Sequence, residues 1–446
     1  MAFVLLNVPF WWLGQTSFLH RAWLNVDLFL PLIVASVSPV AACASLLLLW
    51  ILDMAVSQSL TWHFHSPFEF IRSIEFVPAI DVAGYVTLSR IAMAIPFLGC
   101  GVAAIWLVRR RPRVYLSVLP LLLTVALVDG LNGSSFLWKR ATRFLPGNVA
   151  GSATKVSINS MLSSATDELK ILPPNTALTE QFDVISWAKS HPDRGVLLVL
   201  VESMGLHNDP RMRHWIRDQL VDETISAQFR VDDFSVPFKG STTSAELREL
   251  CHLDGSYRAL SDRDNSSCLP NELGALGWET VGLHGFSHRM FMRGEWWFST
   301  GLQRRLFAEE LAAPAQVLCG GAFVGICDDV VMRRSVREAE GARRFVYALT
   351  LNGHLPLPTA IVPGRLRSVC GESGAGEGVC DLTAVNGVAL RGLREALKTS
   401  GHQPLVLVVG DHSPPFGDLQ SRQQYSQTSV PGFVLVPRCC ISGQQL

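Results

Sequence analysis

The feature that most constrains this chain is an uncharged apolar segment near its N-terminus, Leu28 to Leu52. At about 1.5 Å per residue the segment is long enough to cross a hydrocarbon layer of about 30 Å, so we expect a transmembrane helix. The composition agrees, because 446 residues that are 48% hydrophobic and 17% charged are too apolar for an ordinary soluble enzyme.

Further apolar segments predict a membrane-embedded bundle of three to five spans. Ile91 to Val108 and Val114 to Trp138 read as spans, and Phe3 to Leu19 as either a short span or an interfacial segment. The basic cluster at positions 109–113 is expected in the cytoplasm by the positive-inside rule. The chain after Trp138 should therefore lie outside a bacterial cytoplasmic membrane, facing the periplasm.

We expect three regions along the chain: a transmembrane helical domain over 1–138, a membrane-surface helix and linker over 139–179, and a catalytic domain over 180–446. Lys139, Arg140 and Arg143 stand among apolar residues, which suits either a membrane-surface helix or a solvated linker. Lys+Arg and Asp+Glu balance at 38 each, which argues against nucleic acid as a partner.

Eight of the ten cysteines fall from Cys251 onward, in the polar part of the chain. Their even number indicates disulfides in an oxidising compartment, in agreement with the expected orientation. Closeness in sequence predicts three pairs and leaves Cys439 and Cys440 unassigned. The predicted pairs are Cys251 with Cys268, Cys319 with Cys327, and Cys370 with Cys380.

Continuous apolar runs in the outer region predict an α/β fold with a central, mainly parallel sheet flanked by helices, because strands covered on both faces lack polar alternation. The runs are Gly195 to Val201, Phe345 to Leu351, Leu405 to Val409 and Gly432 to Val436. Two further segments are predicted to be helices, Ala245 to Leu253 and Leu382 to Leu397.

Three of these runs end in residues suited to metal binding or acid–base chemistry. The residues that follow them are Glu202, then Asn352 and His354, then Asp411 and His412. Ligands gather at the carboxyl ends of strands in open α/β sheets, so these side chains predict a metal site.

The segment G-S-T-T-S-A-E-L from Gly240 adds a hydroxyl group. Thr243 and Glu246 have capping-box spacing, which predicts a helix start with Thr242 just before it. A hydroxyl there lies beside free backbone N–H groups and the positive end of the helix, which favours a phosphorylated or alkoxide form. The alternative for this motif alone is a simple helix cap.

The motifs together resemble those of lipoteichoic acid synthases and related phosphoglycerol transferases, of the alkaline phosphatase and sulfatase superfamily that also holds the phosphoethanolamine transferases. They are V-E-S-M-G, S-T-T-S-A-E, L-H-G-F, L-N-G-H-L-P and V-G-D-H, in this order from Val201 to His412. The resemblance covers about Val196 to Pro437.

The resemblance implies roles for individual residues. Glu202, Thr242, Asp411 and His412 would bind one divalent cation, Mn²⁺ or Zn²⁺ or else Mg²⁺, with Thr242 also the nucleophile. His354 would contact the phosphate and aid proton transfer. Head-group contacts would come from His284, Phe291 and Arg293. The family has Phe-Trp where this chain has Met290-Phe291, a departure that bears on head-group identity.

The expected function is transfer of a phospho-alcohol head group, phosphoglycerol before phosphoethanolamine, from a membrane phospholipid to an envelope glycan or glycolipid. A phosphodiesterase of the same superfamily differs only in whether water or an acceptor reaches the site. A sulfatase fits less well, because Glu272 stands where the signature after Cys268 requires arginine. A non-catalytic envelope lipid-binding protein is the alternative from another class.

Overall fold

The structure is a computed structural model. It describes residues 1–16, 21, 23–64, 66–80, 92, 94–110, 120, 150–154, 156–158, 169–262, 265–313, 317–357 and 360–440. The chain folds into two compact units. Unit 1 contains residues 1–74, 86–166 and 416–419, and unit 2 contains residues 75–85, 167–415 and 420–446. The predicted boundaries at 138 and 179 stay a prediction.

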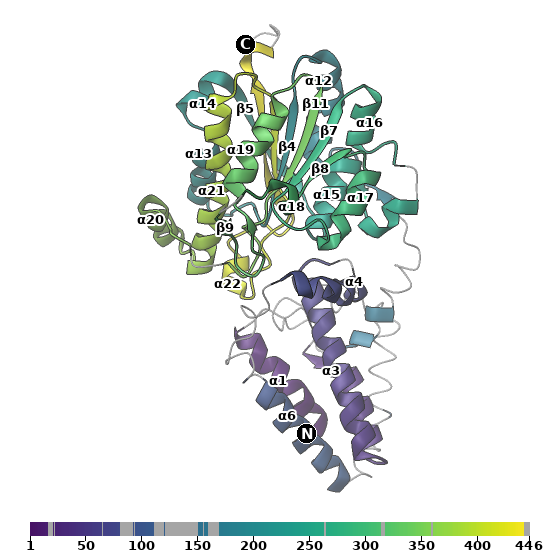
Figure 1. Ribbon diagram of the computed structural model, residues 1–446. Helices are drawn as coiled ribbons and strands as arrows, with labels where there is room; N and C mark the ends of the chain where they lie inside the picture. Colours follow the sequence, from purple (N-terminus) through teal and green to yellow (C-terminus); the bar gives the residue numbers. More distant parts are fainter. Residues whose placement is uncertain are drawn as a thin grey trace. The chain divides into compact units, whose positions relative to one another are not determined.

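Unit 2 is built on a seven-stranded sheet with the order β5-β13-β12-β4-β11-β7-β8 (Figure 1). The strands are β4 (Val196–Val201), β5 (Phe229–Pro237), β7 (Glu279–His284), β8 (Arg304–Leu306), β11 (Arg344–Leu349), β12 (Leu405–Gly410) and β13 (Ser429–Pro437). The central strand β4 is buried along its whole length, as its sequence VLLVLV predicts.

The sheet is mixed, and this qualifies the expected mainly parallel arrangement. Strands β12, β4, β11, β7 and β8 run parallel, whereas β13 is antiparallel to both β12 and β5. The run Gly432 to Val436 is therefore a strand of the opposite direction, although its continuous burial resembles that of its parallel neighbours. An apolar run cannot show whether a strand is parallel or antiparallel, because any strand covered on both faces has an apolar sequence.

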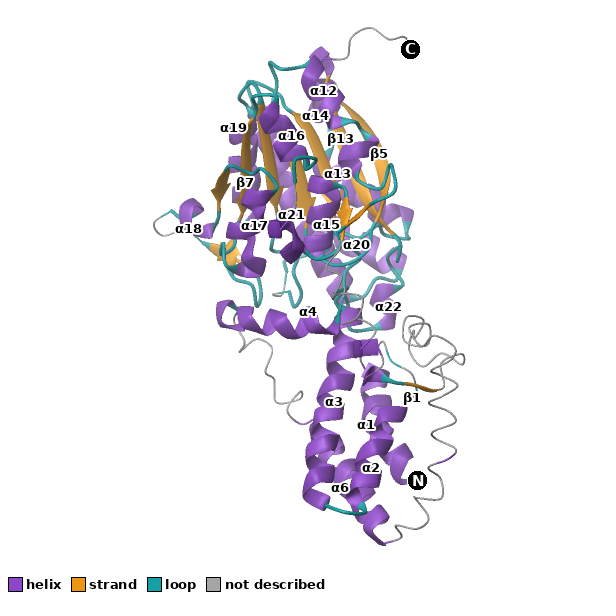
Figure 2. Cartoon of the chain, turned by 90° about the vertical axis from the view of Figure 1, so that its right-hand side faces the viewer, coloured by secondary structure: helices purple, strands orange, loops and turns teal. Residues whose placement is uncertain are grey.

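Helices cover both faces of the sheet (Figure 2). One face, with Leu198, Tyr347 and Leu407, packs into a core with α11 (Leu178–Gln181), α12 (Val184–Ser190), α15 (Thr242–Cys251), α16 (Leu269–Ala275) and α17 (Arg293–Ser299). The helices α13 (Pro210–Leu220), α19 (Asp328–Ala339) and α21 (Glu377–Thr399) pack together on the other side. The predicted helices from Ala245 and Leu382 correspond to α15 and α21.

Further elements of the chain are short. They are α14 (Glu223–Gln228), α18 (Ala308–Leu311), α20 (Gly364–Ser373), α22 (Leu419–Arg422), the pair β3 (Lys170–Ile171) with β6 (Leu253–Asp254), and the pair β9 (Leu318–Cys319) with β10 (Gly325–Ile326). The 3₁₀ segments are η2 (Ser73–Ala79), η4 (Tyr257–Asp262), η5 (Met290–Met292) and η6 (Arg438–Cys440).

The three predicted disulfides are confirmed. Their sulfur atoms lie 2.02, 1.97 and 2.17 Å apart in the pairs Cys251–Cys268, Cys319–Cys327 and Cys370–Cys380. The Sγ atoms of Cys439 and Cys440 lie 3.3 Å apart and are not bonded.

Unit 1 contains the helices α1 (Ala2–Thr16), α2 (Leu30–Ala35), α3 (Pro39–Thr61), α4 (Pro67–Arg72) and α6 (Ala94–Arg110). Before α2 lie the strand β1 (Leu24–Asn25), paired with β2 (Ala150–Gly151), and the 3₁₀ segment η1 (Val26–Phe29). Apolar side chains of α1, α2, α3 and α6 form one buried cluster.

The prediction of one continuous helix from Leu28 to Leu52 is wrong. The chain turns after Ala35, and a new helix begins at Pro39. Proline fits the first helical turn, where its missing N–H is not needed, and the Ser38 hydroxyl caps the new helix by accepting the N–H of Ala41 at 3.3 Å.

Among the described residues, α3 is the one helix long and apolar enough to span a membrane. Within the predicted span Ile91 to Val108, the residues from Ala94 onward belong to α6. The predicted span Val114 to Trp138, apart from Pro120, and the basic residues Lys139 to Arg143 lie outside the described residues. The multi-span bundle therefore stays a prediction.

Candidate active site

The carboxyl ends of the parallel strands deliver the predicted polar residues to one edge of the sheet. Glu202 follows β4 directly, Asp411 and His412 follow β12, and His284 is the last residue of β7. Because β4 and β12 pair in parallel, with Val201 beside Gly410, the residues after them emerge side by side. Strand order and direction thus assemble residues that lie far apart in sequence.

Thr242 is the first residue of α15 and lies within hydrogen-bond distance of three site residues. Its Oγ1 is 3.0 Å from Glu202 Oε2, 3.0 Å from Asp411 Oδ2 and 3.4 Å from His412 Nε2. All four side chains are at most 9% exposed. The hydroxyl is therefore held at the centre of a buried, polar cluster.

The predicted capping box at Thr243 is wrong. Ser241 occupies the N-cap position, Thr242 opens the helix, and the Glu246 side chain turns away to other partners. The Thr243 hydroxyl contacts the Ser241 hydroxyl at 3.2 Å instead of a backbone N–H. The helix therefore begins two residues earlier than the capping box predicted, with Ser241 in place of Thr243 at the cap.

The two carboxylates and the imidazole form a compact ligand group. Suitable ligand atoms of Glu202, Asp411 and His412 all lie within 4.8 Å of one another. The Nδ1 of His412 is 3.0 Å from the Ser413 carbonyl oxygen. Donation of Nδ1–H to this carbonyl leaves the Nε2 lone pair facing Asp411 Oδ2 at 3.2 Å.

The charges at this cluster call for a cation. Burial raises the pKa of Asp411 well above its usual range, and the neighbouring Glu202 carboxylate raises it further. Burial also acts to raise the pKa of Glu202, but His354 and His412 together with hydrogen bonds from Ser203 and Thr242 leave that pKa lowered. Among the described residues, no Lys or Arg side chain is bonded to either carboxylate. Two buried oxygen ligands, one nitrogen and a hydroxyl fit a divalent ion such as Mn²⁺, Zn²⁺ or Mg²⁺.

Close backbone contacts hold the ligands in place. Ser203 has φ 55°, a left-handed conformation that turns its N–H to Asp411 Oδ1 at 2.8 Å. Its hydroxyl donates to Glu202 Oε1 at 2.9 Å. A Cβ at Gly410 would lie 2.0 Å from the Met204 carbonyl oxygen, so glycine is required where β12 meets this turn.

The predicted head-group residues lie on the neighbouring strand end and helix. His284 is buried, its Nδ1 is 3.1 Å from the Leu349 carbonyl oxygen, and its Nε2 has no hydrogen-bond partner within the described part of the chain. Burial lowers the pKa of His284 to about 3, so the imidazole is neutral and presents an acceptor at Nε2. Arg293, at the start of α17, is 3% exposed.

Arg293 is ion-paired within the fold. Its Nη2 donates to Glu246 Oε2 at 2.9 Å, and its Nε donates to the same oxygen at 3.0 Å. Glu246 also accepts hydrogen bonds from Trp297 Nε1 at 2.9 Å and from the Tyr347 hydroxyl at 3.2 Å. Phe291 has φ 52° and lies with its ring centroid 5.3 Å from the Arg293 guanidinium.

His354 lies in the loop after β11. Its Nδ1 is 2.8 Å from the Leu355 carbonyl oxygen, and its ring centroid is 3.8 Å from that of Phe323. Burial lowers its pKa, while the Glu202 carboxylate acts in the opposite direction. The Glu202 carboxylate thus favours the protonated form of the His354 imidazole, whereas burial favours the neutral form.

Sequence reasoning missed several residues that support the site. Arg248 donates to the carbonyl oxygens of Gly410 at 3.1 Å and of Asp411 at 3.3 Å. Glu246 could have been suspected, because four residues place it on the same helical face as Thr242. Phe76, from η2, lies 5.2 Å from the Phe291 ring, and no local pattern connects residues so distant in sequence.

No family model matches the sequence, and no curated protein matches it. Similar solved structures include the lipoteichoic acid synthase LtaP from Listeria monocytogenes, at 16% identity over 56% of this chain and 66% of that chain, with a TM-score of 0.39. A second is a protein in the alkaline phosphatase superfamily from Vibrio parahaemolyticus, at 13% identity over 55% of this chain and 60% of that chain, with a TM-score of 0.39. A third is the Streptococcus pyogenes phosphoglycerol transferase GacH in complex with sn-glycerol-1-phosphate. It has 13% identity over 58% of this chain and 77% of that chain, with a TM-score of 0.38.

The chain spans less than two thirds of the length of the first two structures. The superfamily that the motifs resemble is also present among these solved structures.

Proposed function

We propose that this chain transfers a phospho-alcohol head group from a membrane phospholipid to an envelope glycan or glycolipid through a phospho-threonine at Thr242. The observation that carries the proposal is the Thr242 hydroxyl at the start of α15, 3.0 Å from carboxylate oxygens of Glu202 and of Asp411. A buried hydroxyl at a helix N-terminus, surrounded by ligands for a cation, is suited to attack an anionic phosphodiester.

A divalent cation bound by Glu202, Thr242, Asp411 and His412 would neutralise phosphoryl charge and favour the alkoxide form of Thr242. The proton of Thr242 passes to a neighbouring carboxylate, and its Oγ1 forms a bond to phosphorus as the bond to the lipid glycerol oxygen breaks. That oxygen leaves with a proton supplied through His354. An acceptor hydroxyl then attacks phosphorus and gives its proton to His354. The Oγ1–phosphorus bond breaks, and Oγ1 takes its proton back from the carboxylate to re-form the threonine hydroxyl.

The donor head group is expected to contact His284, Phe291 and Arg293. The neutral His284 presents an acceptor at Nε2, which suits a hydroxyl of phosphoglycerol or an ammonium of phosphoethanolamine. Arg293 supplies positive charge for the phosphate, although Glu246 already balances part of it. We place phosphatidylglycerol before phosphatidylethanolamine as donor.

The test is to incubate the full chain in detergent with each of the two phospholipids, labelled in the head group, then to quench, digest and locate the label. We expect label on Thr242, and its loss when a glycan acceptor is added. Thr242→Ala should abolish labelling and lower head-group release by orders of magnitude. The matched control is Thr243→Ala, which alters the neighbouring threonine and should still be labelled.

Other outcomes separate the competing functions. Label that forms and is lost to water at the same rate with and without acceptors would indicate a phosphodiesterase. Equal head-group release by the wild-type protein and by Thr242→Ala would refute the covalent mechanism. Retention of envelope function after loss of metal binding would favour a non-catalytic lipid-binding protein.

The proposed location is outside the cytoplasmic membrane. The basic residues Arg109 and Arg110 at the end of α6 and the three disulfides support this orientation. A topology reporter fused after Glu180 should therefore be active only in the periplasm. Activity of the same fusion in the cytoplasm would overturn both the orientation and the lipid donor.

A further inference from the structure

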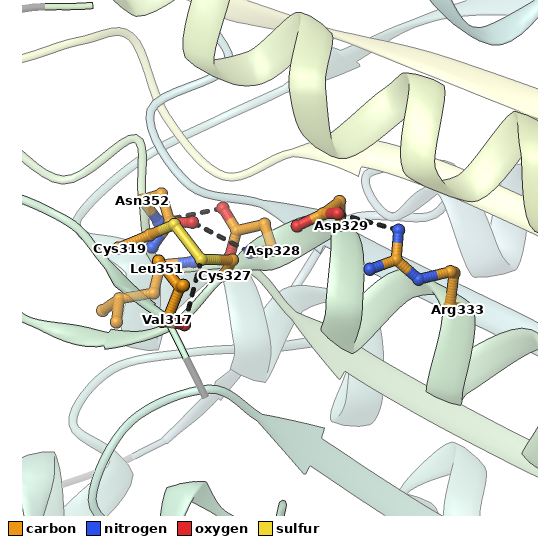
Figure 3. Close-up of a disulfide and its surroundings, with 8 residues drawn as sticks. All are labelled: Val317, Cys319, Cys327, Asp328, Asp329, Arg333, Leu351 and Asn352. Carbon is orange, nitrogen blue, oxygen red and sulfur yellow. Dashed lines mark hydrogen bonds and ion pairs between the residues drawn. A yellow bond between two sulfur atoms is a disulfide. The ribbon is translucent and has the colours of Figure 1, made fainter. Parts of the chain in front are cut away.

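The loop that carries His354 is fastened to the start of α19 by one buried carboxylate (Figure 3). Asp328 Oδ1 accepts the N–H of Leu351 at 2.8 Å, and Oδ2 accepts the N–H of Asn352 at 2.9 Å. In return, the Asn352 side-chain oxygen accepts the N–H of Asp328 at 2.8 Å. His354 N in turn donates to the Leu351 carbonyl oxygen at 2.9 Å. A continuous set of hydrogen bonds thus connects Asp328 to the backbone of His354.

The same loop also lies close to the end of β4, where the ligand residue Glu202 follows the strand. A Cβ at Gly353 would lie 2.4 Å from the Glu202 carbonyl oxygen. The loop therefore has little space to move toward β4. A change in the Asp328 anchor would be expected to displace the loop away from the site.

A disulfide-closed loop contacts His354 from another direction. Cys319 and Cys327 close a loop that contains Phe323, whose ring centroid is 3.8 Å from that of His354. Ile326 of this loop donates its N–H to the Gly285 carbonyl oxygen at 2.8 Å, next to His284. Phe323 is 6% exposed, so its ring is held in a buried position against the imidazole. Cys327 directly precedes Asp328, which joins the disulfide and the carboxylate in one anchor (Figure 3).

We propose that Asp328 and Phe323 are positioning residues that hold the His354 imidazole where it exchanges protons with the leaving and incoming oxygens. The inference rests on the proposed function, in which His354 serves that role. Asp328 fixes the backbone of the loop, and Phe323 fixes the ring. Neither residue touches the reacting atoms, so both act through His354.

The next residue along α19 offers a matched control. Asp329 is 30% exposed at its side chain and pairs with Arg333 one turn later, with 2.7 Å between Oδ2 and Nη1 (Figure 3). Asp328→Asn and Asp329→Asn therefore make the same change of side chain, carboxyl to amide, at adjacent positions. Only the first alters the anchor of the His354 loop.

The experiment is a double-mutant cycle with the full chain, measuring head-group release from labelled phosphatidylglycerol. Asp328→Asn should lower kcat by about 10- to 100-fold with little change in KM, since misplacement of a catalytic group by about 1 Å has effects of this size. Asp329→Asn should leave kcat unchanged. In a His354→Ala background, Asp328→Asn should reduce kcat by less than about 2-fold further, because the group that it positions is already absent.

The outcomes distinguish this inference from the proposed function. If His354→Ala released head group as fast as the wild-type protein, the proton-transfer role of His354 would be wrong. If His354→Ala were slow but the effect of Asp328→Asn multiplied fully with it, the positioning inference alone would fail. If Asp328→Asn did not fold, Phe323→Leu would replace it in the same cycle, with the same expected non-additivity.

Discussion

At the scale of single residues, the candidate site concentrates buried charge around one hydroxyl. Asp411 is 1% exposed and Glu202 5% exposed, and their carboxylates face the same Thr242 oxygen. Buried like charges are unfavourable unless a proton or a cation lies between them. The ligand atoms of these two carboxylates and of His412 lie within 4.8 Å of one another, a spacing that fits a divalent ion.

The residue that should matter most for that ion is Asp411. Asp411→Asn keeps the shape but removes one anionic ligand, so we expect the metal content of the purified chain to fall from about one ion to a fraction of that. Elemental analysis after dialysis measures it. Asp209→Asn, at a partly exposed ion pair with Arg211, is the control and should retain the ion. Equal metal content in both variants would show that the ligand group is wrongly assigned.

A second residue-scale prediction concerns the buried ion pair between Glu246 and Arg293. Glu246→Gln leaves the guanidinium buried without its counter-ion and should reduce the free energy of unfolding by about 3 to 5 kcal/mol. Glu295→Gln, on the exposed side of α17, should change it by less than about 0.5 kcal/mol. Denaturant unfolding followed by tryptophan fluorescence compares the two, and similar midpoints would contradict the assigned role.

At the scale of elements, α3 combines an apolar sequence with one fully buried charge. Asp53 lies within this helix and is paired with Arg21, whose Nη2 is 2.8 Å from Oδ2 and whose Nε is 3.1 Å from Oδ1. The Arg21 Nη2 also donates to the Asn7 side-chain oxygen at 2.9 Å. The pair therefore connects α3 to α1, and it explains how an apolar helix accommodates an aspartate.

Replacing one member of this ion pair should destabilise unit 1 more than replacing both members. Asp53→Asn leaves Arg21 buried and unpaired, with an expected loss of about 3 to 5 kcal/mol. The double substitution Arg21→Met with Asp53→Leu replaces both charges by apolar groups and should recover most of that loss. Thermal unfolding in detergent compares the variants. A double variant as unstable as Asp53→Asn would argue against the pair as the cause.

At the scale of the whole molecule, positive and negative side chains are equal in number, at 38 each, so buried groups should dominate the pH dependence of stability. His207 is 5% exposed and its ring lies 4.3 Å from that of Tyr425. Burial lowers its pKa to about 3. Between about pH 6.5 and pH 3, His207 therefore stays neutral in the folded chain but is protonated in the unfolded chain.

The sign of the effect follows from this difference. Because the pKa of His207 is lower in the folded chain, the unfolded chain binds the proton first as pH falls below about 6.5, and stability decreases with it. Between pH 7.5 and 5 the loss should be about 2 kcal/mol. His207→Phe retains a ring beside Tyr425 but cannot titrate. Between pH 7.5 and 5, the free energy of unfolding of this variant should therefore fall by about 2 kcal/mol less than that of the wild-type protein. His214→Gln, whose parent side chain is 71% exposed, is the control and should follow the wild-type curve.

The sequence alone determined four strands of the sheet and the order of the ligand residues, and it correctly predicted the disulfide pairs from closeness in sequence. These are local or nearly local properties. A buried strand must be apolar, the residue after it must emerge at the strand end, and cysteines close in sequence can meet with little loss of chain entropy. Glu202, Asp411 and His412 could therefore be predicted from local patterns, because they come immediately after such strands.

Only the tertiary structure decided the direction of β13, the partner of Glu246 and the anchoring of His354 by Asp328. Glu246 has the spacing of a capping residue, yet its carboxylate bonds Arg293, Trp297 and Tyr347. A buried charge takes the partners that compensate its desolvation best, and those come from other elements. Such partners are set by long-range packing, which a local pattern of residues does not encode.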